Sequence, residues 1–171
     1  QIMDRASLEK VAAFAKAHDL IVIADEIYCD LTYEGQHTCF ASLPDMQERT
    51  IVLNGFSKSY AMTGLRIGYV CAPREALEEI YKVHQYEILC ASTTSQYGAI
   101  EALRNCDDDV KAMFEEYAAR REMIYQGLVD IGLTVFKPKG AFYIFPDISC
   151  TGMDEEEFCD RLLTEEKVGV V

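Results

Sequence analysis

The sequence lacks the features that mark membrane, secreted and nucleic-acid-binding proteins. No apolar run approaches the roughly 18–20 residues that a membrane-spanning helix needs. The first residues, QIMDRASLEK, have no signal-peptide pattern. Basic residues are scarce, because 16 Lys and Arg stand against 29 Asp and Glu, for a formal net charge of −13. A nucleic-acid-binding protein normally shows the opposite bias. We therefore expect neither a membrane nor a nucleic acid as partner.

The sequence also lacks a CxxC motif, although it contains seven cysteines. The cysteines are scattered and odd in number, and only three histidines, His18, His37 and His84, could join them. This pattern favours neither a disulfide framework nor a metal site. We expect reduced thiols, no metal and a cytoplasmic location.

Both ends of the sequence suggest a piece of a longer protein. Gln1 stands without an initiator Met at the start of a predicted helix, and the final residues VGVV are typical of the start of a strand. Half of the 171 residues are apolar, which is enough for one ordinary domain with a core.

The first part of the chain alternates helical and strand patterns. A helix is predicted from an N-cap at Ser7 to Ala17. The apolar run at residues 21–25, IVIAD, predicts a strand buried on both faces, and residues 50–55 and 65–73 predict two more strands. This alternation predicts an α/β fold with a mostly parallel sheet.

The second part is predicted to be mainly helical and then changes character. Further helices are predicted over residues 74–89, 91–105, 107–131 and 154–167, and residues 133–149 predict a hairpin around Pro138-Lys139-Gly140. We therefore expect a layered α/β region over residues 1–106, a connecting helix over 107–131, and the beginning of a smaller α+β unit over 132–171.

The segment from Ile51 to Val70 contains two cations, Lys58 and Arg66, and no acid. A buried cation is costly unless something neutralises it, so either both side chains reach solvent or the missing anion is a ligand. Ligands of open α/β sheets bind beyond the carboxyl ends of strands. The first strand ends at Asp25, with Tyr28 shortly after it. A carboxylate, a phenol, an amine and a guanidinium suit pyridoxal phosphate.

These motifs have a close family resemblance. The segments ADEIY and NGFSKSYAMTGLRIGYV, followed by STTSQYGAIEAL, closely resemble the class I/II (fold type I) pyridoxal-phosphate aminotransferases, and most closely their aspartate/aromatic subgroup. The likeness covers essentially the whole chain. It implies an α-β-α layered large domain followed by the start of a small α+β domain, and an active site at a homodimer interface. It also implies amino-group transfer between an L-amino acid, with aspartate or an aromatic one as the guess, and a 2-oxo acid.

The resemblance implies a role for each site residue. Lys58 would hold the cofactor covalently and move a proton between the substrate Cα and cofactor C4′. Asp25 would pair with the protonated pyridine nitrogen, Tyr28 would donate to O3′, and Arg66 would bind the phosphate. Ser57 is either a phosphate neighbour or a turn residue. Gly55 stands where many relatives have a phosphate-binding hydroxyl.

Several alternatives stay open from the sequence. The same residues would serve a C–S lyase, a ligand-sensing domain of a transcription regulator has this fold, and an unrelated α/β domain is a third possibility. Relatives have further cofactor and substrate contacts outside the matched region, so we expect the 171 residues alone to bind cofactor poorly and not to turn over. Glu26 is predicted to be solvated, with a salt bridge near the site as the alternative.

Overall fold

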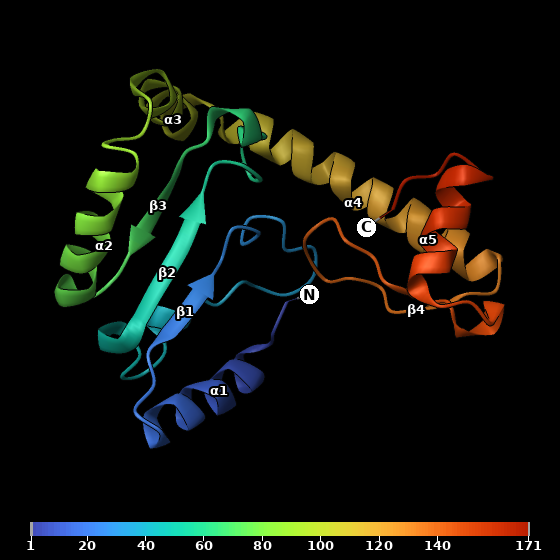
Figure 1. Cartoon of the computed structure of the whole chain (residues 1–171), viewed down its shortest axis with the longest axis horizontal. Coiled ribbons are helices and arrows are strands. Elements are labelled where there is room, and N and C mark those ends of the chain that lie inside the picture. The colour runs from blue at the N-terminus through green and yellow to red at the C-terminus, as the bar shows by residue number, and fades with distance from the viewer. Residues whose placement is uncertain (1, 171) are drawn as a thin grey trace. The chain divides into compact units, whose positions relative to one another are not determined.

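The computed structural model describes residues 2–170 (Figure 1). Contacts within the chain divide it into two units. Unit 1 contains the residues up to Tyr117 together with Lys139–Ala141, and unit 2 contains Ala118–Pro138 and the residues from Phe142 onward. The helices are α1 (Arg5–Ala17), α2 (Arg74–Glu87), α3 (Thr93–Asn105), α4 (Asp107–Asp130) and α5 (Glu155–Thr164), and the strands are β1 (Val22–Asp25), β2 (Thr50–Gly55), β3 (Gly68–Cys71), β4 (Thr134–Val135) and β5 (Pro146–Asp147).

Helix α1 begins earlier than the sequence predicted. Its N-cap is Asp4, whose Oδ1 accepts a hydrogen bond from the backbone N–H of Ser7 at 2.7 Å. The predicted cap at Ser7 is therefore wrong. Asp and Ser are comparably good caps, and with Asp4 in that role Ser7 becomes the third helical residue. This bond also lowers the pKa of Asp4 from its ordinary value.

The α/β class is confirmed, and the sheet of unit 1 is mixed. Strand β2 lies between its two neighbours, pairing parallel with β1 and antiparallel with β3 (Figure 1). The predicted mostly parallel sheet is thus half parallel within residues 2–170. The connection from β2 to β3 contains only the short 3₁₀ turn η3 (Thr63–Leu65). A parallel pairing would have needed a longer crossover.

One face of β1 is covered and the other is not. Val22 and Ala24 pack against a core cluster of residues from α1 and the loop after β1, namely Ala12, Phe40, Leu43 and Met46. Ile23 points the other way, because side chains alternate along a strand, and it is 67% exposed. The predicted burial of this strand on both faces is therefore wrong for the described part of the chain.

Helix α3 packs against the connection between β2 and β3. Ala99 and Ala102 of this helix form a buried cluster with Phe56, which directly follows β2. Tyr60, Met62 and Ile67 pack at the edge of the same cluster. The helix therefore supports the segment that contains Lys58 and Arg66.

The predicted hairpin is partly confirmed. Strands β4 and β5 pair antiparallel, but each has two residues. Pro138-Lys139-Gly140 lies in the connection between these strands, as predicted, but it forms no tight turn there, because Lys139, Gly140 and Ala141 pair with residues 31–33 of unit 1. The N–H of Tyr33 donates to the Lys139 carbonyl and that of Ala141 to the Leu31 carbonyl, each at 2.8 Å.

The long helix and the end of the chain complete the description. Helix α4 is divided between the units at Tyr117–Ala118, and the predicted domain boundaries at residues 106 and 131 stay predictions. Residues 168–170 form no strand, contrary to the sequence expectation, while Gln1 and Val171 lie outside the described residues. Within residues 2–170, no helix combines the length and apolar character required to span a bilayer.

Candidate functional site

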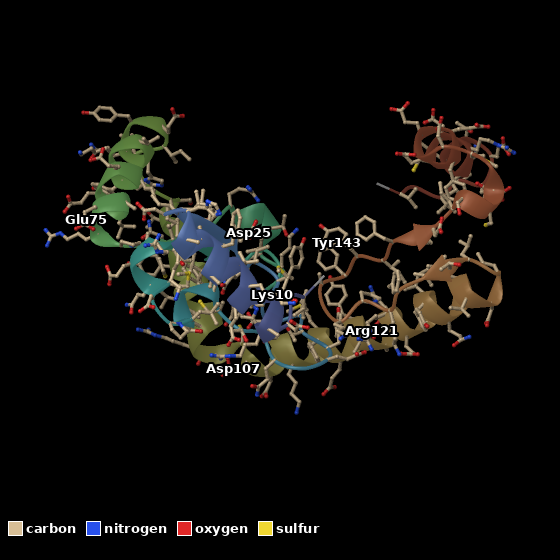
Figure 2. All side chains as sticks on the ribbon, turned by 90° about the horizontal axis from the view of Figure 1, so that it is seen from below. Lys10, Asp25, Glu75, Asp107, Arg121 and Tyr143 are labelled. Carbon is tan, nitrogen blue, oxygen red and sulfur yellow. The ribbon has the colours of Figure 1, made fainter. Side chains whose placement is uncertain are left out.

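The candidate site lies where two parallel strands end. Asp25, the last residue of β1, pairs in register with Leu53, and β2 ends two residues later at Gly55. Because β1 and β2 are parallel, their carboxyl ends lie at one edge of the sheet. The Asp25 side chain, labelled in Figure 2, is exposed, and its Oδ1 accepts a hydrogen bond from the Ile27 N–H at 3.2 Å. A carboxylate is thus available to a ligand at this edge.

Lys58 and Tyr28 come together at the same edge. The Lys58 Nζ lies 5.8 Å from the centroid of the Tyr28 ring, within the range of a cation–π contact. Both residues are half-buried, and they come from the turns that follow β2 and β1 respectively. Two residues separated by 30 positions in sequence therefore meet as predicted from the strand ends.

Two backbone segments come close together just before residues 56–60, the turn that contains Lys58 and is here called the lysine turn. A Cβ on Gly55 would lie 2.8 Å from the Cα of Gly68, and one on Gly68 would lie 2.9 Å from the Asn54 carbonyl oxygen. Real Cβ atoms essentially never come so close to backbone. This approach explains why no hydroxyl-bearing side chain stands at Gly55 in this chain.

Arg66 occupies an unusual backbone conformation at the end of η3. Its φ is +49°, in the left-handed region, which costs a non-glycine residue free energy. The side chain is exposed, and its Nη1 donates to the Thr63 carbonyl at 2.9 Å. Within residues 2–170 the guanidinium has no carboxylate partner. Ser95 of α3 braces this turn, because its Oγ donates to the Leu65 carbonyl at 2.6 Å.

Ser57 contributes a backbone group to the same turn. Its carbonyl accepts a hydrogen bond from the Thr63 Oγ1 at 2.8 Å. This hydrogen bond connects the start of the lysine turn to the start of η3. It uses the Ser57 carbonyl and does not involve the Ser57 hydroxyl. The role of that hydroxyl therefore stays a prediction.

Glu26 was predicted to be solvated, and that prediction is wrong. Its side chain is 9% exposed. Its Oε2 lies 2.8 Å from the His37 Nε2, and its Oε1 accepts from the Phe40 N–H at 2.8 Å. The alternative interpretation, a side-chain partner for Glu26 beside the site, agrees with this contact, which is a salt bridge when the His37 ring is protonated. Nothing in the sequence pattern singled out His37, which lies in the irregular loop after β1.

A second contact that the sequence did not reveal joins the two turns. The Asn54 side-chain amide donates to the Cys29 Sγ at 3.3 Å, and the Asn54 Oδ1 accepts from the Gly55 N–H at 2.7 Å. Burial raises the pKa of the Cys29 thiol, although the bond from Asn54 opposes that shift. The Cys29 thiol is therefore harder to ionise than an exposed cysteine.

A cavity of about 370 Å³ adjoins this edge of unit 1. Asp25, Glu26, Tyr28, His37 and Gly140 are among its lining residues, whereas Lys58 and Arg66 are not. The cavity thus reaches part of the predicted site. Among the described residues, no group of three or more His, Cys, Asp or Glu side chains is arranged to hold a metal ion.

Comparison with known proteins gives a consistent result. The family profile described as aminotransferase class I and II matches residues 1–171. The chain is 46% identical to an aspartate aminotransferase of Pyrococcus abyssi and 42% identical to aromatic-amino-acid aminotransferase 2 of Thermococcus litoralis, in each case over 99% of this chain and 44% of the relative. It superposes with a TM-score of 0.95 on the crystal structure of an aromatic aminotransferase from Pyrococcus horikoshii, at 44% identity, over 99% of this chain and 46% of that one. The chain therefore spans less than half the length of these relatives.

Proposed function

Because this chain belongs to the class I and II aminotransferases, we propose that it carries the cofactor-holding region of a pyridoxal-phosphate-dependent aminotransferase. The reaction is the transfer of an amino group between an L-amino acid and a 2-oxo acid. The observation that carries this proposal is the meeting of the Lys58 amine and the Tyr28 ring, 5.8 Å apart, at the carboxyl ends of parallel strands.

The side chains at this edge fit the groups of the cofactor. The exposed Asp25 carboxylate suits a protonated pyridine nitrogen, and the Tyr28 phenol suits an oxygen at ring position 3. The Lys58 amine is the group that can hold an aldehyde carbon. When bound, pyridoxal phosphate supplies an electron sink that stabilises negative charge at the substrate Cα. The freed Lys58 amine then acts as general base and acid for the Cα proton.

Arg66 is the proposed phosphate-binding residue. Its guanidinium is exposed, and in the described part of the chain it has no carboxylate partner. A planar fork of N–H donors binds phosphate oxygens in a bidentate manner, which an ammonium group cannot do. The Ser57 hydroxyl is proposed as a secondary phosphate contact.

The proposed substrates follow from the names of the relatives. One is named an aspartate aminotransferase, and two carry the word aromatic in their names. We therefore infer L-aspartate or an aromatic L-amino acid as amino donor for this protein.

The proposed assembly is a homodimer in the cytoplasm. Apolar side chains of α2 and α3 are exposed, for example Tyr86 at 87% and Tyr97 at 71%, and would supply apolar area to a homodimer interface. All seven cysteines are free, which is in keeping with a reducing compartment.

The experiment that tests the function uses the full-length product of the gene that encodes this sequence. Pyridoxal phosphate is added, the adduct is reduced with borohydride, and the labelled peptide is found by mass spectrometry. A phosphopyridoxyl group on Lys58 supports the proposal, and a label on another lysine or none contradicts it. Incubation with amino donors then separates an aminotransferase, which yields a 2-oxo acid without ammonia, from a lyase, which releases ammonia.

A further inference from the structure

We propose that Glu26, acting with His37, is a positioning residue that fixes the turn presenting Asp25 and Tyr28 to the cofactor. The inference deepens the proposed function and rests on it. Glu26 directly follows Asp25 and lies two residues before Tyr28. Its own side chain is committed to protein groups, so it acts on the ligand through its neighbours.

The first argument is the burial of the carboxylate. A carboxyl group that is 9% exposed is costly unless its oxygens are satisfied. Here both oxygens are used, one by the Phe40 N–H and the other by the His37 ring, each at 2.8 Å. The hydrogen bond from the Phe40 N–H holds Glu26 in place, because Phe40 is itself packed in the core cluster beside α1 and is only 4% exposed.

The second argument is that the backbone of Glu26 is fixed as well. Its N–H donates to the Leu53 carbonyl of β2 at 2.9 Å, and its carbonyl accepts from the Cys29 N–H at 2.9 Å. The Cys29 sulfur in turn accepts a hydrogen bond from the Asn54 side-chain amide. The turn is therefore attached to β2 at two points and to the loop after β1 through the Glu26 side chain.

The third argument is the direction of neighbouring side chains. Val22 and Ala24 face the core cluster beside α1, and side chains alternate along a strand. Glu26 continues the Val22–Ala24 side and reaches Phe40 of that cluster, so Asp25 is directed to the other side. The exposure of Asp25 agrees with this alternation. Loss of the Glu26 bonds would thus let the Asp25 carboxylate and the Tyr28 ring move relative to Lys58.

The test compares four forms of the full-length protein: wild type, Glu26→Ala, Glu26→Gln and Thr50→Val. In the Gln variant the amide oxygen can accept from Phe40, and its NH₂ can donate to His37. Thr50 is the matched structural control, because it is 1% exposed and its hydroxyl donates to the Met46 carbonyl at 2.7 Å, at the other end of β2. The readouts are the Kd for pyridoxal phosphate, the pH dependence of the visible absorption of the bound cofactor, and the Tm of the apoprotein.

Glu26→Ala is expected to weaken cofactor binding about tenfold or more, the size of effect that outer-shell partners have on metal sites, and to shift the pH dependence of the absorption. The Kd of Glu26→Gln for pyridoxal phosphate is expected to stay within about threefold of the wild-type value. Thr50→Val is expected to lower the Tm without changing the Kd. Two results would overturn the inference. One is that Glu26→Ala and Thr50→Val lose the same affinity for pyridoxal phosphate when their Tm falls by the same amount. The other is that Glu26→Ala binds pyridoxal phosphate as tightly as wild type.

If Glu26→Ala does not fold, His37→Phe replaces it. This variant removes one of the two bonds and keeps the bond between Glu26 and Phe40. A weakened Kd then supports the inference, and an unchanged Kd overturns it. Failure of the wild-type protein to bind cofactor would instead overturn the proposed function, so the two failures are distinguishable.

Discussion

Gly55 and Gly68 face each other across β2 and β3 so closely that a Cβ on Gly55 would lie 2.8 Å from the Cα of Gly68. The same Cβ would lie 3.0 Å from the Ile67 carbonyl oxygen. Both neighbours are backbone atoms, one of the first residue of β3 and one of the residue before it, so neither can move aside alone. The two glycines therefore set the spacing at the entrance to the lysine turn.

The first prediction follows from this contact. Gly55→Ala is expected to lower the free energy of unfolding by about 1–3 kcal/mol, because an inserted carbon in a packed site forces backbone to shift. Chemical denaturation of the full-length protein measures this change. Gly64→Ala is the control, since a Cβ there meets nothing within 4 Å. Equal stability of the two variants would contradict the argument.

The second prediction concerns the Tyr28 hydroxyl. Tyr28→Phe keeps the ring beneath the Lys58 amine and removes one proposed hydrogen bond to the cofactor. A neutral hydrogen bond contributes about 0.5–1.5 kcal/mol, so pyridoxal phosphate affinity is expected to fall by up to about tenfold. The measurement is a cofactor titration of the apoprotein.

Tyr69→Phe is the control for this titration. Tyr69 lies on β3, where its ring contacts Phe56, and burial raises the pKa of its hydroxyl. Its substitution is expected to leave the cofactor Kd unchanged. An unchanged Kd in Tyr28→Phe as well would remove Tyr28 from the list of cofactor contacts.

The order of elements and the main site pair could be predicted from the sequence. The predicted ends of the first two strands, Asp25 and Gly55, are the observed ends of β1 and β2, and parallel pairing of these strands brings Tyr28 and Lys58 together. The role of Glu26 could not be predicted, because its partner His37 lies in an irregular loop whose path depends on tertiary packing. The path of the chain at Lys139 could not be predicted for the same reason, because the Lys139 carbonyl accepts a hydrogen bond from the distant Tyr33 N–H and not from a residue nearby in sequence.

The third prediction concerns the pH dependence of cysteine reactivity. Burial raises the pKa of the Cys29 thiol above its ordinary value of 9.0, and the thiolate is the reactive form. At pH 8, iodoacetamide is therefore expected to label the exposed Cys90 well before Cys29 in the folded protein. Peptide mass spectrometry over time measures both rates, and labelling in denaturant, where the rates should converge, is the control.

The same shift has a consequence for stability. A thiol whose pKa is raised by folding stabilises the protein fully below its ordinary value and loses this contribution as the pH rises through the folded value. Cys29→Ala is therefore expected to flatten the decline in unfolding free energy above about pH 9. An unchanged slope in that variant would show that other groups cause the decline.

The fourth prediction separates the backbone of Arg66 from its guanidinium. The φ of +49° is unfavourable for arginine and permitted for glycine, so Arg66→Gly is expected to relieve about 1–2 kcal/mol of conformational cost while losing the bond to the Thr63 carbonyl. The net free energy of unfolding should then stay equal to wild type or rise slightly. Cofactor affinity should nevertheless fall, because the proposed phosphate ligand is gone. Denaturation and cofactor titration measure the two quantities independently.

Arg66→Lys completes this comparison. Lysine retains the charge but cannot make a bidentate contact, so its affinity for pyridoxal phosphate should lie between those of wild type and Arg66→Gly. Titration with pyridoxal, which lacks the phosphate, provides the control, and the three proteins should bind it equally. If Arg66→Gly binds pyridoxal phosphate as tightly as wild type, Arg66 is not the phosphate ligand, and another side chain must be sought for that role.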